Sequence, residues 1–279
     1  MTLEQLLQKG TIQLEEANIS EAKLDAMYLL EHVCQITRMD YLLDAKKPVS
    51  AEQEEEYDAF ISKRAQHIPL QQLLGEQEFM GYSFFVNENV LIPRQDTEIL
   101  VEEVAKLGSG KRILDVCTGS GCILLSLEKL CEPVVAVGVD ISEQALEVAN
   151  KNKERLASKA KFLHSDLLEK VEGTYDIIVS NPPYIASAVI PTLMEEVREH
   201  EPMLALDGGE TGLDFYEKIV EQSVSYLNEG GYLCFEIGYD QGKAVSGMMQ
   251  EKGFIDCKVI KDLAGLDRVV IGQWSEEHG

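Results

Sequence analysis

Residues 112–122, Arg-Ile-Leu-Asp-Val-Cys-Thr-Gly-Ser-Gly-Cys, decide the fold class of this 279-residue chain. The run 112–116 is short, apolar and rich in branched side chains, which is typical of a buried strand. Glycines at 119 and 121 permit a tight turn, and they let a ligand approach the backbone before a helix begins. A strand that passes through a glycine turn into a helix indicates a ligand-binding α/β fold.

Strands and helices alternate from residue 97 onward. Apolar runs predict strands at 112–116, 134–139, 161–163, 175–180 and 231–237. Helical spacing predicts helices at 97–107, 121–130, 143–157, 213–227 and 240–252. Repeated units of this length indicate a parallel sheet with helices on both faces. Two final strands, 256–261 and 268–273, are joined by a short loop and predict an antiparallel edge.

Polar residues follow or end four successive strands of the predicted sheet: Asp115, Asp140, Asp166 and Asn181. Ligands of open α/β sheets bind beyond the carboxyl ends of the strands, so four such residues in register indicate a binding site. Asp140 can accept hydrogen bonds from both hydroxyls of a ribose. Asp166 suits the amino group of an adenine, and Leu167 beside it can pack on the ring.

The loop after the first strand consists of Cys117, Thr118, Gly119, Ser120 and Gly121. It lacks the third glycine of a dinucleotide-binding loop and the Lys-Ser/Thr pair of a phosphate loop. With Asp115 at its start, it fits a positively charged ligand better than a pyrophosphate. S-adenosylmethionine carries a sulfonium and an α-amino group, both cationic, so we expect this cofactor rather than a nicotinamide.

Asn181-Pro182-Pro183-Tyr184 directly follows the predicted strand 175–180. The two prolines hold the chain extended and remove two backbone donors, so the Asn181 side chain and nearby carbonyls are left as acceptors. Acceptors suit a ligand that brings N–H donors, such as a primary amide or an exocyclic amine, and Tyr184 adds a flat face. A turn that merely ends a strand is the alternative. The acids on the three preceding strands favour the reacting end of a methyl-transfer cleft.

The first part of the chain has a different character. Leucines recur at helical spacing before residue 70, and Ser50-Ala51-Glu52-Gln53 resembles a capping box. Two short aromatic runs on either side of Gly81 predict a hairpin. We therefore expect a helical domain over 1–74, a β-hairpin linker over 75–95 and a cofactor-binding domain over 96–279.

The formal net charge of −24, from 49 acidic and 25 basic residues, disfavours direct binding of nucleic acid. A basic protein partner would be attracted instead. The six cysteines include no Cys-x-x-Cys pair and do not cluster with the five histidines, which argues against a metal site. No apolar stretch has the length of a membrane span, and the first residues lack a signal-peptide pattern. We expect a cytoplasmic, monomeric protein.

The chain resembles the HemK/PrmC family of class I methyltransferases, which modify a glutamine of peptide-chain release factors. The resemblance covers essentially the whole chain. It rests on Ile92-Pro93-Arg94, Asp115–Gly121, Ser180–Tyr184, Leu206–Gly209 and Glu236-Ile237-Gly238. Asn-Pro-Pro-Tyr is shared with DNA adenine and RNA guanine methyltransferases. The helical domain, the hairpin and the Ile-Pro-Arg segment therefore select this family.

The resemblance implies a Rossmann-like seven-stranded domain that transfers a methyl group from S-adenosylmethionine and leaves S-adenosylhomocysteine. The implied acceptor is the side-chain amide nitrogen (N5) of the glutamine in the Gly-Gly-Gln motif of class I release factors. Asn181 and Pro182 would hold the amide hydrogens, Pro183 and Tyr184 would complete the substrate site, and the helical domain would recognise the release factor. A DNA or RNA exocyclic-amine methyltransferase is one alternative, and a catalytically silent binding protein is the other.

Overall fold

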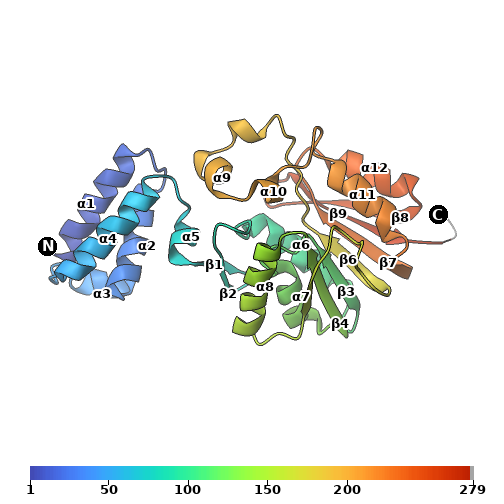
Figure 1. Ribbon diagram of the computed structural model, residues 1–279, viewed down its shortest axis with the longest axis horizontal. Helices are drawn as coiled ribbons and strands as arrows, with labels where there is room; N and C mark the ends of the chain where they lie inside the picture. Colours follow the sequence, from blue (N-terminus) through green and yellow to red (C-terminus); the bar gives the residue numbers. More distant parts are fainter. Residues whose placement is uncertain (277–279) are drawn as a thin grey trace. The chain divides into compact units, whose positions relative to one another are not determined.

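The computed structural model describes residues 1–276, and the chain divides into two compact units. Unit 1 comprises Met1–Glu76 together with Met194–His200. Unit 2 comprises Gln77–Leu193 together with Glu201–Gly279. The elements of both units are drawn in Figure 1. A short stretch from the second half of the chain thus belongs to the compact unit formed by the first 76 residues.

Unit 1 is a group of helices around an apolar core. Its helices are α1 (Leu3–Glu16), α2 (Ala22–Cys34), α3 (Arg38–Leu43), α4 (Ala51–Arg64), α5 (Leu70–Leu74) and α9 (Glu195–His200). Thr2, Thr37 and Ser50 begin α1, α3 and α4 with capping boxes, which give partners to backbone N–H groups that the first turn leaves unpaired. The predicted helical region and the predicted capping box at Ser50 are confirmed.

Arg64 joins three segments of unit 1. Its buried guanidinium donates to Asp25 of α2 at 2.7 Å, to Glu196 of α9 at 2.7 Å and to the Ile68 carbonyl at 3.2 Å. Burial raises the pKa of Asp25, and the hydrogen bond from Arg64 opposes that shift. A buried charge of this kind is tolerated because it is paired and hydrogen-bonded. Glu196 is thereby fixed to the helices of unit 1.

Gly10 allows α1 to lie close to α4. A Cβ atom added at Gly10 would overlap the Tyr57 hydroxyl and lie 2.9 Å from Ile61 Cδ1. The Tyr57 hydroxyl is fully buried and donates to the Ala26 carbonyl at 3.0 Å, so the ring cannot move without losing that bond. Gly10→Ala is therefore expected to lower the free energy of unfolding by about 1–3 kcal/mol, measured by urea denaturation followed by circular dichroism.

Gly247, in α12 (Gly242–Glu251), provides the matched control. No atom lies within 4 Å of a Cβ atom added there. Gly247→Ala should raise the free energy of unfolding by up to about 1 kcal/mol, because alanine is the better helix former. Equal effects of the two substitutions would contradict the close packing of α1 on α4.

Unit 2 contains a seven-stranded sheet with strand order β5-β4-β3-β6-β7-β9-β8. The strands are β3 (Arg112–Val116), β4 (Val135–Asp140), β5 (Lys161–His164), β6 (Tyr175–Ser180), β7 (Leu227–Glu236), β8 (Phe254–Lys261) and β9 (Asp267–Trp274). Strands β3 to β7 pair in parallel, whereas β9 is antiparallel to β7 and β8. The predicted fold class, a mostly parallel sheet with an antiparallel edge, is confirmed.

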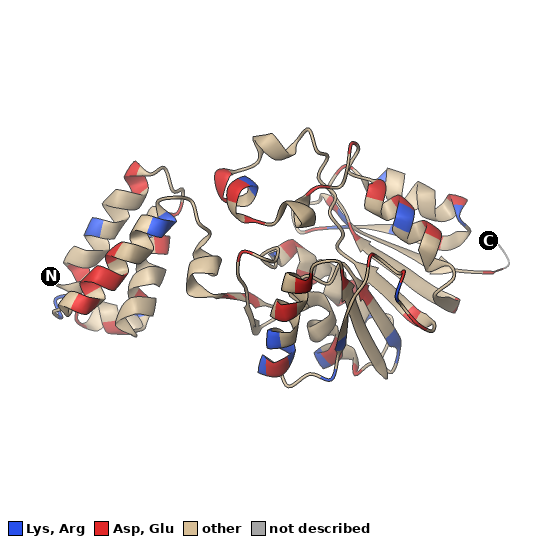
Figure 2. Ribbon diagram, viewed as in Figure 1, with Lys and Arg blue, Asp and Glu red and all other residues tan. Residues whose placement is uncertain are grey.

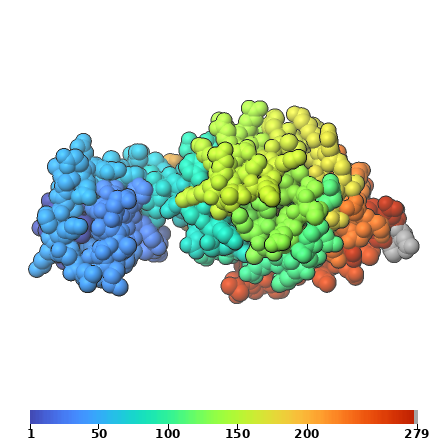
Figure 3. Space-filling view, turned by 90° about the horizontal axis from the view of Figure 1, so that it is seen from below, coloured from blue at the N-terminus to red at the C-terminus, as the bar shows by residue number. Residues whose placement is uncertain are grey.

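Helices cover both faces of this sheet (Figure 1). One face carries α6 (Gln95–Ala105), α7 (Cys122–Cys131) and α8 (Glu143–Arg155), and the other carries α11 (Asp214–Ser223) and α12. Ile113 and Ile177 pack with α6 and α7, while Leu114 and Ile178 belong to the core under α11 and α12. Both faces of a parallel sheet are buried, which explains why its strands read as continuous apolar runs. Figure 3 shows one face of the protein in a space-filling view, coloured along the sequence.

The chain changes direction across the sheet between β3 and β6. From β3 it moves outward to β4 and β5, and it then returns to β6 on the other side of β3. This is a topological switch point, where ligands of open α/β sheets bind. The segment after β6 forms η1 (Ile190–Thr192) and α10 (Met203–Leu206) before α11 begins.

A two-stranded hairpin, β1 (Glu76–Phe79) and β2 (Tyr82–Phe85), precedes α6. Its turn residues Met80 and Gly81 both have positive φ, as the favoured two-residue turns require. Asn152 of α8 anchors β2, because its side chain accepts from the Phe85 amide at 2.6 Å and donates to the Phe85 carbonyl at 3.0 Å. The same amide group donates to the Ser120 carbonyl at 2.9 Å, which ties the glycine-containing loop to α8.

Acidic residues are distributed over the helices of both units, with fewer basic residues among them (Figure 2). Among the described residues, no helix combines the length and the apolar character that a membrane crossing requires. The excess of acids agrees with the formal charge of −24.

Candidate active site

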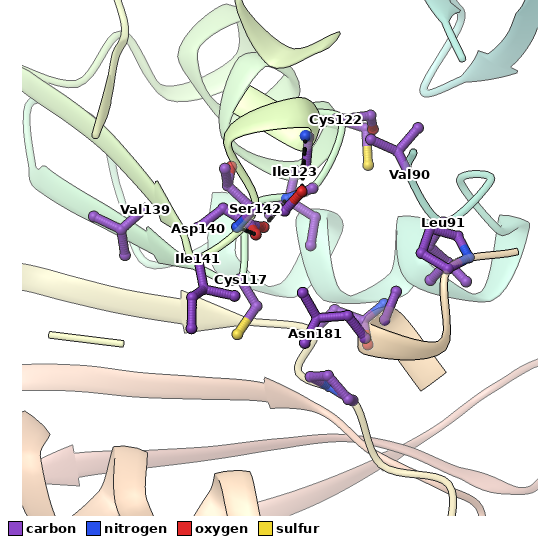
Figure 4. Close-up of a pocket in the computed structure, with 18 of the residues that line it drawn as sticks. Val90, Leu91, Cys117, Cys122, Ile123, Val139, Asp140, Ile141, Ser142 and Asn181 are labelled. Atoms are coloured by element: carbon purple, nitrogen blue, oxygen red, sulfur yellow. Dashed lines mark hydrogen bonds between the residues drawn. The ribbon is translucent and has the colours of Figure 1, made fainter. Parts of the chain in front are cut away.

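A cavity of about 280 Å³ lies in unit 2 at the carboxyl ends of the central strands. Asp140, Asp166 and Asn181, from three of the predicted strand ends, line it together. Figure 4 shows Asp140, Cys117 and Asn181 around one space. Apolar side chains, including Leu91, complete most of the wall. A mostly apolar cavity with a few converging polar groups is typical of a small-molecule site.

The loop after β3 is shaped by three residues with left-handed backbone conformation. Cys117, Gly119 and Gly121 have φ values of 61°, 54° and 78°. Cys117, Thr118, Gly119 and Ser120 line the cavity. A Cβ atom at Gly121 would lie 2.9 Å from the Phe162 ring of β5, so glycine is needed for that close approach. The loop thereby presents its backbone to the cavity.

Asp140 connects the loops that follow β3 and β4. One carboxylate oxygen accepts from the Gly119 amide at 2.9 Å. The other accepts from the Ser142 amide at 2.9 Å, and both Asp140 and Ser142 are labelled in Figure 4. Burial raises the pKa of Asp140, and these backbone donors oppose the shift. Each oxygen of an ionised carboxylate can accept a second hydrogen bond. Asp140 can therefore hold the two loops and bind a ligand at once.

Asp115 lies behind the loop and is not part of the cavity wall. Its Oδ2 atom accepts from the Thr118 hydroxyl at 2.6 Å, and its buried Oδ1 atom has no hydrogen-bond partner among residues 1–276. Burial raises the pKa of this carboxyl to about 7, and the nearby charge of Asp140 adds to the shift. A cation bound beside the loop would stabilise the ionised form of both acids.

Within Asn-Pro-Pro-Tyr, Asn181 and Pro183 line the cavity, whereas Pro182 and Tyr184 do not. Gln241 fixes the backbone that follows, because its side chain donates to the Tyr184 carbonyl at 3.0 Å and to the Gly212 carbonyl at 3.1 Å. Such bonds give a fixed path to a segment that the prolines have deprived of donors.

Glycines let a second segment cross this one at close range. A Cβ atom at Gly208 would lie 2.7 Å from the Tyr184 Cα atom, and one at Gly212 would overlap the Tyr184 carbonyl oxygen. Gly212 also has a positive φ of 76°, which side chains disfavour. The stretch from Gly208 to Gly212 therefore needs glycine for the close packing as well as for its turn.

A buried carboxyl lies beside Asn-Pro-Pro-Tyr. Glu236, at the end of β7, is 2% exposed, and its Oε1 atom accepts from the Tyr184 hydroxyl at 3.3 Å. Burial raises the pKa of Glu236 to about 6, while the Thr97 hydroxyl, the charge of Arg268 and the Tyr184 hydroxyl oppose the shift. Burial also raises the pKa of Tyr184, and the charge of Glu236 adds to that effect.

The sequence did not reveal several residues of the site. Phe215 and Lys218 of α11 line the cavity, Thr97 of α6 is both a lining residue and a partner of Asn181, and Gln241 holds the segment after Asn181. No local motif marks them, because their positions depend on how helices pack at the sheet edge. Among residues 1–276, no group of three His, Cys, Asp or Glu side chains could hold a metal ion.

Comparison with known proteins gives matches over both parts of the chain. Residues 5–75 match the PrmC N-terminal domain, and residues 94–210 match the methyltransferase small domain. The release factor glutamine methyltransferase of Geobacter sulfurreducens is 40% identical over 262 residues, which are 93% of this chain and 92% of that protein. The release factor glutamine methyltransferase of Clostridium botulinum is 42% identical over 278 residues, which are 97% and 98% of the two chains.

A solved methyltransferase from Pyrococcus furiosus shares the fold, with a TM-score of 0.54 at 20% sequence identity. The similarity covers 69% of this chain and 88% of that chain. The two Geobacter and Clostridium relatives, in contrast, align with nearly the full length of this sequence. This chain belongs to the release factor glutamine methyltransferase family.

Proposed function

We propose that this protein transfers a methyl group from S-adenosylmethionine to the side-chain amide nitrogen of the glutamine in the Gly-Gly-Gln motif of class I peptide-chain release factors. The observation that carries the proposal is the position of Asn181. This acceptor of amide hydrogens lines the same cavity as Asp140 and Asp166, which suit the nucleoside of the cofactor. The names of the relatives support the same substrate.

The residues of the cavity fit S-adenosylmethionine. Asp140 keeps acceptor capacity on both oxygens for the two ribose hydroxyls, although each already accepts one backbone N–H. Leu167 and Phe215 offer apolar surface for an adenine, and Asp166 offers an acceptor for its amino group. The loop from Cys117 to Gly121 allows close approach to the backbone. When bound, S-adenosylmethionine supplies an electrophilic methyl group on a sulfonium centre.

The acidic environment behind the loop matches a cationic ligand. Asp115 and Asp140 each have a raised pKa, and the charge of Asp140 adds to the cost of ionising Asp115. A sulfonium and an ammonium group would relieve that repulsion. We infer that Asp115 contributes to cofactor binding through its charge and by holding Thr118, rather than through an exposed carboxylate oxygen.

The glutamine amide needs careful orientation because its nitrogen lone pair is delocalised and is a poor nucleophile. The Asn181 Oδ1 atom and the Pro182 carbonyl would each accept one amide hydrogen and aim the nitrogen at the methyl group. The same acceptors would stabilise the positive charge that develops on nitrogen during transfer. Pro183 and Tyr184 would pack against the glutamine and its neighbouring glycine, and water would be excluded from the mostly apolar cavity.

The partner is expected to be a protein. A net charge of −24 opposes the approach of a nucleic acid, whose binding depends on basic residues that neutralise phosphates. A basic surface on a release factor would be attracted to the acidic helices. We propose that the helices of unit 1 recognise the release factor, and that the protein acts in the cytoplasm as a monomer.

Mass spectrometry of a release factor after incubation with this protein and S-adenosylmethionine tests the proposal. We expect a gain of one methyl group on the glutamine of Gly-Gly-Gln, and no gain in a release factor with that glutamine replaced by alanine. DNA and RNA incubated in parallel should gain none. Methylated nucleobases with an unmodified release factor would support the exocyclic-amine alternative instead.

A further inference from the structure

The side chains of Thr97, Tyr184 and Glu236 form a polar cluster beside Asn181, which we call the Glu236 cluster. Thr97 and Glu236 are buried, and Tyr184 is partly buried. Thr97 is 3% exposed and Glu236 is 2% exposed. The Asn181 Nδ2 atom donates to the Thr97 Oγ1 atom at 3.5 Å, and the Tyr184 hydroxyl donates to Glu236. Glu236 does not line the cavity. The cluster therefore connects the amide on the cavity wall to a carboxyl that lies outside the cavity.

Hydrogen-bond direction in this cluster determines which end of the Asn181 amide faces the cavity. The oxygen of a side-chain amide accepts hydrogen bonds and its NH2 group donates them. The two groups have nearly the same size, so their hydrogen-bond partners decide which one points where. When Nδ2 points to Thr97, Oδ1 is left for the cavity. The opposite orientation would present N–H donors to a substrate amide that also offers N–H donors. Only the first orientation can receive a glutamine amide hydrogen.

The Thr97 hydroxyl has a single proton. Because its oxygen accepts from Asn181, that proton must be given to another acceptor. Glu236 is the nearby carboxyl, and the Thr97 hydroxyl favours its ionised form. The buried Oε2 atom of Glu236 has no hydrogen-bond partner among residues 1–276. An ionised carboxylate only accepts. Donation from Thr97 to the free Oε2 atom of Glu236 would complete one direction, from Asn181 to Thr97 and from Thr97 to Glu236.

We propose that Glu236 is a positioning residue that, through the Thr97 hydroxyl, holds the Asn181 amide with its oxygen toward the cavity. This inference rests on the proposed role of Asn181 as an acceptor of glutamine amide hydrogens. A protonated Glu236 would donate to Thr97, and the Thr97 proton would then turn toward Asn181. The amide would rotate and present its donor end to the substrate.

Charged and titratable groups from five other segments face Glu236. They are Asp96 on α6, Cys122 on α7, Tyr184 after β6, Tyr216 on α11 and Arg268 on β9. Arg268 is paired with Asp96 at 3.2 Å and with Asp262 at 3.0 Å, so its charge is shared. Burial outweighs these groups and raises the pKa of Glu236 to about 6. Above that pH the carboxylate is ionised and Asn181 is aligned, whereas below it alignment is lost, so kcat should fall as pH decreases through about 6.

Two pairs of variants test the inference by steady-state kinetics with a release factor. Thr97→Val removes the hydroxyl at nearly constant volume, and it should lower kcat on the order of 100-fold with an unchanged affinity for S-adenosylmethionine. Thr97→Ser keeps the hydroxyl and should keep kcat. Glu236→Gln can donate to Thr97, so it should lower kcat to a similar extent and remove the fall of kcat near pH 6. Glu236→Asp keeps an ionisable acceptor and should retain part of that fall.

A purely structural Glu236 would leave the pH profile of Glu236→Gln like that of the wild type, and this result would overturn the inference. Thermal unfolding and calorimetry with S-adenosylmethionine establish that each variant is folded. If Thr97→Val does not fold, the pH profiles of wild type and Glu236→Gln decide alone. A fully active Asn181→Ala would refute the proposed role of Asn181, on which this inference rests, whereas a release factor left unmethylated by the wild type would refute the proposed function. An inactive Asn181→Ala beside a fully active Thr97→Val would refute only the role of Glu236.

Discussion

Asn181→Ala is expected to lower kcat by about 100- to 1000-fold, because it removes one of two acceptors that orient the substrate amide and stabilise charge in the transition state. Asn181 lies at the end of β6 on the cavity wall, whereas the expected cofactor contacts come from Asp140, Asp166 and the loop after β3. The dissociation constant for S-adenosylmethionine should therefore stay close to that of the wild type. Single-turnover methylation of a release factor and titration calorimetry measure the two quantities separately.

Asn150→Ala provides the matched control for this experiment. Asn150 is also an asparagine with one hydrogen bond, from its side chain to the Leu146 carbonyl at 2.8 Å, but it lies on α8 and does not line the cavity. It should leave both kcat and cofactor affinity unchanged. A wild-type rate for Asn181→Ala would exclude the role of this side chain in catalysis.

The central strands could be predicted from the sequence because both of their faces are buried. The predicted bounds 112–116 and 175–180 agree with β3 and β6. Successive residues of these strands pack alternately into the apolar cores on the two faces of the sheet. The start of β7 was predicted four residues late, at 231 instead of Leu227, since Gly230 and Gly231 interrupt its pattern. Helix α9 was missed altogether, because none of its residues is buried and no apolar periodicity marks it.

In the site, too, the residues at strand ends could be predicted from the sequence, whereas those brought in by helix packing could not. Acids at the ends of parallel strands are visible in sequence, because strand ends share one edge of the sheet. The direction in which a side chain points is less visible. Side chains of β3 alternate between the two faces of the sheet, so Asp115 lies on the same face as Ile113, which packs with α7. Asp115 therefore does not line the cavity, although the loop that follows it does. Thr97 and Phe215 reach the site from α6 and α11, whose docking no short pattern encodes.

Asp140→Asn is expected to have the complementary effect, a loss of cofactor affinity on the order of 100-fold or more. A hydrogen bond to a charged group contributes about 1.5–3 kcal/mol, and each 1.4 kcal/mol changes a dissociation constant about tenfold. The asparagine keeps only one acceptor oxygen, so one of the present bonds from Gly119 and Ser142 is lost as well. The loop after β3 would then lose part of its support on the cavity wall.

Asp256→Asn is the matched control for Asp140→Asn, because Asp256 is an exposed aspartate on the edge strand β8 and does not line the cavity. Titration calorimetry should give a wild-type dissociation constant for this control. At saturating S-adenosylmethionine, Asp140→Asn should retain most of its kcat, since Asn181 and the Glu236 cluster are unchanged. A lowered kcat with a wild-type dissociation constant would instead place Asp140 with the groups that orient the glutamine. Affinity lost at Asp140 and turnover lost at Asn181 would together establish that the two ends of one cavity bind the cofactor and the amide.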